Sequence, residues 1–86
     1  MPEISRFFGI VVAMYFRDHD PPHFHARYGE HKAKFDIETG KLIEGTMPRR
    51  ARALVQEWCT LHLDELRADW ELVQARKSPN KIEPLE

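Results

Sequence analysis

Two histidines, His23 and His25, are the residues in this sequence best suited to chemistry. They belong to the segment His-Asp-Pro-Pro-His-Phe-His, and on a strand both side chains leave the same face, with Cβ atoms about 6.5–7 Å apart. That spacing allows two imidazoles to share a metal ion or to flank a phosphate group. Because the Pro21-Pro22 corner is rigid, His19 can fold back toward the pair as a third nitrogen.

One hypothesis for this cluster is a site for zinc or another divalent metal, with His19, His23 and His25 as ligands. The two-residue spacing of His23 and His25 is its only geometric support, since His-x-His is common on exposed strands. Carboxylates that can add an oxygen ligand are those of Asp18, Asp20 and Asp36.

A second hypothesis needs no metal or other cofactor and uses the same strand face to bind RNA or DNA. His23 and His25 can act as acid and base in RNA cleavage, which would make the protein a weak or activated ribonuclease, although the sequence leaves open whether it is an enzyme. The alternatives are a face that simply meets solvent and a protein-interaction module without catalysis. The cations predicted to bind phosphates on and beside this face are Arg27, Lys32, Lys34, Arg49 and Arg50.

Charge and composition limit the classes of protein that need considering. The formal net charge is −1, which excludes a strongly basic nucleic-acid-binding protein. Residues 1–56 nevertheless carry nine basic and seven acidic side chains, against four and seven in residues 57–86, so a polyanion site belongs in the first part. The single cysteine, Cys59, indicates a reducing, cytoplasmic setting. The longest apolar run, residues 7–16, is too short for a membrane span of about 20 residues, and no membrane partner is expected.

The first half of the chain has the pattern of a β-sheet. Residues 7–16 are rich in β-branched and aromatic side chains and predict one strand buried on both faces. Residues 23–37 alternate around Gly29-Glu30 and predict a hairpin, with a further short strand at residues 41–43. The predicted hairpin register pairs Tyr28 with His31, Arg27 with Lys32, His25 with Lys34 and His23 with Asp36.

The second half predicts helix. Apolar residues recur at helical spacing between residues 49 and 76, either in one long helix or in two abutting ones. They are Ala51, Leu54, Val55, Trp58, Leu61, Leu63, Leu66, Trp70 and Val73, with His62 inside the same arc. We therefore expect one α+β domain over residues 1–76, and residues 77–86 form a flexible tail. Its antiparallel sheet has three or four strands, and the helical C-terminal third packs on one face of it.

The His-Asp-Pro-Pro-His-Phe-His segment also carries a resemblance, together with Ile4-Ser5-Arg6-Phe7-Phe8-Gly9-Ile10, Tyr28-Gly29-Glu30 and the helical Glu57-Trp58, Leu61-His62, Leu66 and Trp70. Over roughly residues 3–72 the chain resembles a family of short prokaryotic proteins catalogued as domain of unknown function four-one-six-zero. The resemblance implies a member of a two-gene cassette of toxin–antitoxin type, with a small cognate protein as partner. It assigns no chemistry. A small domain of this kind also gains stability as a homodimer.

Overall fold

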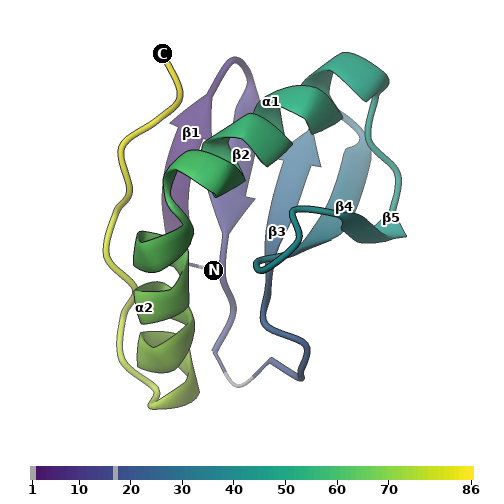
Figure 1. The fold of residues 1–86 in the computed structure, drawn as a ribbon. Helices are drawn as coiled ribbons and strands as arrows, with labels where there is room; N and C mark the ends of the chain where they lie inside the picture. The colour runs from purple at the N-terminus through teal and green to yellow at the C-terminus, as the bar shows by residue number, and fades with distance from the viewer. Residues whose placement is uncertain (1, 17) are drawn as a thin grey trace.

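The chain forms a five-stranded antiparallel sheet followed by two helices (Figure 1). The structure is a computed structural model that describes residues 2–16 and 18–86. Each strand pairs with the strand next to it in sequence, so the sheet is an antiparallel meander, and its longest connection lies between β2 and β3. This confirms the α+β prediction, with a higher strand count than predicted. The elements are β1 (Glu3–Phe7), β2 (Ile10–Ala13), β3 (His23–Tyr28), β4 (His31–Asp36), β5 (Leu42–Gly45), α1 (Arg49–Leu61) and α2 (Leu63–Gln74).

The additional strand arises where the sequence predicted one continuous strand over residues 7–16, and that prediction is wrong. A tight turn at Phe8-Gly9 divides the segment, and Phe7 pairs with Ile10 across it. Phe8 and Gly9 have φ angles of 49° and 80°, the positive values that a two-residue hairpin turn of type I′ requires. An asparagine ordinarily precedes the glycine in such turns, so Phe8 gave no sequence signal for it.

The central hairpin, β3 and β4, has the predicted register in all four predicted pairs. Gly29 has a φ of 57°, which suits the first central position of a type II′ turn. The alternation places Phe24 and Phe35 in the core, where their rings stack at 5.6 Å. The apolar pattern therefore determines this register, because a one-residue shift would expose both rings.

Helix α1 crosses one face of the sheet, and Trp58 is its central core residue (Figure 1). The Trp58 ring lies 5.4 Å from Phe7 and 5.6 Å from Phe24, and its side chain is fully buried. The helical segment is broken at His62, whose φ of −120° lies outside the helical range, so two helices form. Leu61, the last residue of α1, was predicted to be a core residue but is 64% exposed.

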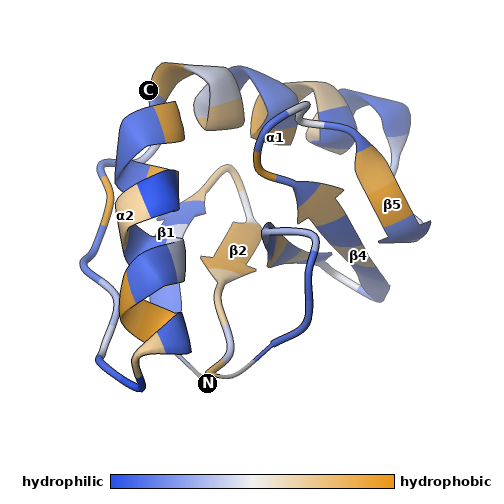
Figure 2. Cartoon of the chain, turned by 60° about the horizontal axis from the view of Figure 1, so that its bottom comes forward, coloured by the Kyte–Doolittle hydropathy of each residue, from blue (hydrophilic) through white to orange (hydrophobic). Residues whose placement is uncertain are grey.

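Residues 77–86, for which composition predicted a flexible tail, return along α2 (Figure 1) and bury Ile82 and Leu85. The backbone N–H of Ile82 donates to the carbonyl of Ile4, and the Trp58 indole N–H donates to the carbonyl of Glu83. The segment thus contacts both the first strand and the central core residue. Figure 2 shows that β2, which lies between β1 and β3 in the sheet, is hydrophobic along its length. Among the described residues, none of the helices is long and apolar enough to cross a membrane.

Candidate functional site

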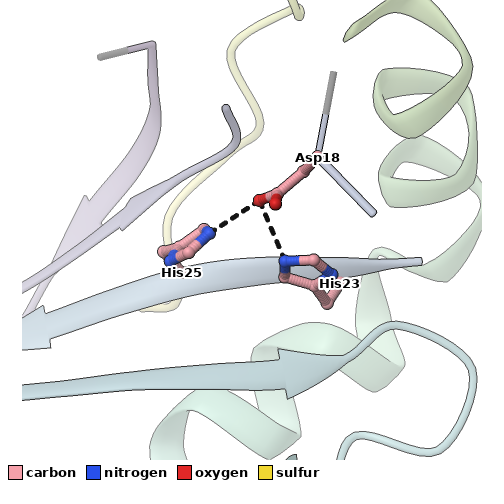
Figure 3. Close-up of side chains that lie close together, drawn as sticks. All are labelled: Asp18, His23 and His25. Atoms are coloured by element: carbon pink, nitrogen blue, oxygen red, sulfur yellow. Dashed lines mark hydrogen bonds and ion pairs between the residues drawn. The ribbon is translucent and has the colours of Figure 1, made fainter. Parts of the chain in front are cut away.

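Three ligand-type side chains converge at the end of the sheet: Asp18, His23 and His25 (Figure 3). The Nε2 atoms of both imidazoles lie 2.9 Å from the same carboxylate oxygen, Oδ2 of Asp18. One ligand atom from each residue lies within 4.8 Å of the other two. His23 is buried, whereas His25 and Asp18 are half-buried, so the cluster sits at the boundary between core and solvent.

Both the strand and the loop before it position this cluster. Alternation along β3 sends His23 and His25 to the same face, and the loop brings Asp18 back above them. The Pro21 carbonyl accepts a hydrogen bond from Nδ1 of His23 at 2.8 Å. From α2, the side-chain amide of Gln74 donates to the Asp18 carbonyl, and the Trp70 ring lies 5.4 Å from that of His23. The cluster therefore depends on contacts with the second helix as well as on the strand.

His23 faces two oxygen atoms that can only accept hydrogen bonds from it: the Pro21 carbonyl and the ionised Asp18 carboxylate. A neutral imidazole has one N–H and one lone pair. Whichever nitrogen holds the proton, the other directs its lone pair at an oxygen less than 3 Å away. A second proton or a metal cation at this point removes the repulsion. A metal ion fits the tautomer with Nδ1–H on Pro21, because metal-bound histidines commonly donate their other N–H to a carbonyl.

The electrostatics of the other two members favour forms that can bind a cation. Partial burial acts to raise the pKa of Asp18, but the His25 hydrogen bond, the electrostatic effect of the His23 ring and the hydrogen bond from the His19 backbone N–H outweigh it and hold this pKa below its usual value. Partial burial lowers the pKa of His25, and the hydrogen bond with Asp18 does not fully offset that effect. Near neutral pH, an ionised carboxylate therefore faces a neutral imidazole, and metal binding requires both forms.

The predicted metal ligands need one correction: Asp18, not His19, is the third member of the cluster. The His19 side chain is exposed, and only its backbone N–H contacts the cluster, through a hydrogen bond to Asp18 Oδ1. The sequence offered Asp18 as one of three carboxylates near the histidines but gave no reason to prefer it. The printed sequence does not show the contact that holds this segment of the loop, the hydrogen bond from the Gln74 side-chain amide to the Asp18 carbonyl.

The predicted catalytic pair is not equally accessible. His23 is only 4% exposed, and both of its ring nitrogens already have partners. His25 is half-buried and lines a hollow on the sheet face that α1 leaves uncovered. Of the two, His25 is therefore the one that a substrate can reach. The prediction of an exposed histidine face is wrong for His23, because α2 covers that end of the strand with Trp70.

The structure also divides the predicted basic patch. Arg27 and Lys32 lie opposite each other on β3 and β4 and line the hollow that contains His25. Lys34 forms an ion pair of 3.0 Å with Glu44 on β5. Arg50 lies elsewhere, in a second hollow with Phe8 and Tyr28. Arg49, the first residue of α1, is exposed and does not line the hollow that contains His25.

The remaining reactive side chains have structural partners. His62 bonds Glu65 at 2.6 Å and packs against the Trp58 ring at 5.7 Å, a contact expected of a partly buried core histidine. Cys59 is buried and donates to the Ile37 carbonyl, and burial raises the pKa of its thiol to about 11. A thiol with that pKa is a poor nucleophile at neutral pH, which agrees with the packing role predicted for it.

Comparison with known proteins gives one family. A family model described as domain of unknown function (DUF4160) matches residues 9–71, a span that holds the Asp18–His23–His25 cluster and most of both helices. No curated protein and no solved structure matches the chain. Because the family model covers well over half of the sequence, the chain belongs to the family of domain of unknown function DUF4160.

Proposed function

We propose that this protein binds a divalent transition-metal ion through Asp18, His23 and His25. The observation that carries the proposal is the convergence of two Nε2 atoms on one carboxylate oxygen, with His23 already bonded to the Pro21 carbonyl through its other nitrogen. Without a cation, the lone pair on Nε2 of His23 faces an oxygen of the Asp18 carboxylate. A cation held among the three ligand atoms attracts all of them. Two histidines and one carboxylate form a known ligand set for such ions, and they leave coordination positions open for water or substrate.

The spacing supports the same conclusion. Ligands that lie about 2.1 Å from an ion and at right angles to each other are about 3 Å apart. Each histidine nitrogen is 2.9 Å from the Asp18 oxygen, so the three donors need little rearrangement to bind an ion. Imidazole ligands favour zinc, copper, iron or nickel over a site for Mg²⁺ alone.

Calorimetric titration of the purified, chelator-treated protein with Zn²⁺, Ni²⁺ and Mn²⁺ tests the proposal. We expect one ion per chain, and a loss of affinity of at least about tenfold in each of Asp18→Asn, His23→Gln and His25→Gln. His19→Gln is the matched control, since it removes a neighbouring histidine outside the cluster, and it should bind like the wild type. Affinity should fall as the pH drops, because protonated imidazoles do not bind metals, and the lowered pKa of His25 places its share of this loss below the usual histidine range.

Equal losses in His19→Gln and His23→Gln would contradict the assignment of ligands. Full binding by Asp18→Asn would show that the carboxylate is not a ligand. Failure of the wild type to bind any of the three ions would remove the proposal altogether, whatever the variants do.

A second candidate function is acid–base cleavage of RNA by His25 without a metal ion. It is favoured by the 2.9 Å contact between His25 and Asp18, which orients the imidazole, and by the position of His25 at the edge of the uncovered hollow. Such an activity would suit the toxin of a toxin–antitoxin pair, the role that the family resemblance implies. The chelator separates the two functions: metal-free cleavage survives it and is lost in His25→Gln, whereas metal-dependent activity is lost in both cases.

A further inference from the structure

The hollow beside His25 has the features of a binding groove on the uncovered side of the sheet. It has a volume of about 200 Å³, and among the side chains that line it are Val11, Ala13, Tyr15, His25, Arg27 and Lys32. The two aliphatic residues form its apolar part on β2, and the two cations lie across β3 and β4. The Tyr15 ring meets the His25 ring edge to face at 4.2 Å. An apolar floor, an aromatic side chain and two cations thus line one groove.

The carboxylates on this face form their ion pairs with other cations, although the charge of Arg27 still helps to lower the pKa of Glu3. Arg6 pairs with Glu3 at 2.8 Å on one side, and Lys34 pairs with Glu44 at 3.0 Å on the other. Within the described part of the chain, neither Arg27 nor Lys32 forms an ion pair. They also lie directly opposite each other on neighbouring strands, an arrangement of like charges that destabilises a sheet. An anion held between them would turn that repulsion into attraction.

We propose that this groove binds a single strand of nucleic acid, with a phosphate between Arg27 and Lys32 and the adjoining nucleotide over Val11 and Ala13. A nucleotide combines the anion that the cations need with a flat, partly apolar base that suits the floor and Tyr15. A hollow of about 200 Å³ can take one unstacked base, whereas a duplex keeps its bases paired and stacked inside. An acidic peptide would satisfy the cations but would make no use of the apolar floor.

The nucleic-acid strand would be a second ligand, bound beside the proposed metal ion. This inference rests on the proposed function only where the ion and the strand are expected to act together. His25 belongs to both the cluster and the groove, so a bound ion would lie next to the nucleotide. Binding of the strand itself needs Arg27 and Lys32 and not the ion. The two proposals can therefore fail separately.

Fluorescence anisotropy with labelled eight-nucleotide RNA and DNA strands tests the groove. We expect Arg27→Gln with Lys32→Gln to weaken binding at least tenfold and to flatten the salt dependence by about 0.7 for each phosphate that the variant no longer binds. Lys77→Gln is the matched control, because it removes an exposed lysine at the far end of α2 and should change neither quantity. Far-ultraviolet circular dichroism and melting curves establish that the double variant is folded.

Several competitors sharpen the test. Wild-type affinity in the folded double variant would overturn the proposal, as would equal binding of polyglutamate or of a duplex of the same sequence. Competition by a mononucleotide at the same concentration as the strand would assign the groove to free nucleotides instead. A difference between RNA and DNA would identify the strand that is bound. Strand binding by the His23→Gln variant in the presence of chelator would uphold the groove even if the metal centre fails.

Discussion

The two faces of β3 carry opposite kinds of side chain, although both are built from the same six residues. Phe24 and Ala26 point into the core beneath α1, whereas His23, His25 and Arg27 point to the other side. The first face is buried at Phe24 and Ala26 and becomes exposed only at Tyr28, the last residue of the strand. The second changes along its length, from buried His23 to half-buried His25 to exposed Arg27.

The contrast shows that alternation decides which side a residue faces but not what covers that side. At the His23 end, α2 supplies Trp70 and Gln74, and a histidine predicted to meet solvent becomes part of a buried cluster. At the Arg27 end nothing from the helices reaches the strand face, and a groove remains. A metal centre and a binding groove can therefore share one strand because the helix covers only part of it.

The largest effect should come from the covered face. Trp58→Ala should lower the free energy of unfolding by about 3–5 kcal/mol, because it leaves a large cavity between Phe7 and Phe24 and removes the hydrogen bond to the Glu83 carbonyl. Urea denaturation measures this change. A loss below about 1 kcal/mol would mean that α1 does not cover the sheet as described.

The next prediction concerns the C-terminal segment, residues 77–86, which runs alongside α2 (Figure 1). Ile82→Ala should cost about 2–4 kcal/mol, since shortening the buried side chain leaves a cavity, while the backbone hydrogen bond to Ile4 is retained. Lys77→Ala, an exposed position in the same segment, should change stability by less than about 0.5 kcal/mol. Denaturant melts of the two variants compare them. If both are neutral, the segment is the flexible tail that its composition predicted.

A smaller difference should separate the two histidines on the second face. His23→Gln should destabilise by about 1–3 kcal/mol in metal-free protein, because it disturbs the hydrogen bond to the Pro21 carbonyl and the contact with Trp70 in a buried site. His25→Gln should cost less, since the side chain is half-buried. Paired thermal and urea melts give the ranking. The reverse order would contradict the proposed gradient of burial along the strand.

The smallest effect concerns Cys59, whose Sγ lies beneath α1 and donates to the Ile37 carbonyl. Because burial raises its pKa to about 11, stability should be unaffected below pH 9 and should fall as the pH rises from 9 toward 11. A disulfide reagent at pH 8 should label the thiol only in urea. Rapid labelling of the native protein would show that α1 separates readily from the sheet.

Local signals explain which parts of this fold the sequence predicted. The β3–β4 hairpin followed from the alternation and from Gly29, both of which act between neighbouring residues. The β1–β2 turn was missed because Phe8 adopts a positive φ that its residue type does not favour. Burial of Ile82 was missed because it depends on contact with Ile4, far away in the sequence.

The same division applies to the candidate site. His23 and His25 were predicted to act together because two residues on one strand face are neighbours by geometry. The choice of Asp18 over His19 depends on the path of the loop and on Gln74, and neither is visible in the local sequence. Likewise, Arg27 and Lys32 were predicted to be opposite partners, whereas the neutralisation of Lys34 required β5 to bring Glu44 beside it.

Binding of one metal ion by Nε2 of His23, Nε2 of His25 and the Asp18 carboxylate can be observed atom by atom. Nitrogen-15 NMR of the imidazoles during titration with Zn²⁺ does this, because metal-bound, protonated and free ring nitrogens have different shifts. We predict that Nε2 of His23 and His25 become metal-bound at one ion per chain, that Nδ1 of His23 keeps its proton on the Pro21 carbonyl, and that His19 is unchanged. Metal-type shifts at His19, or no change at His23 and His25, would contradict the proposed site.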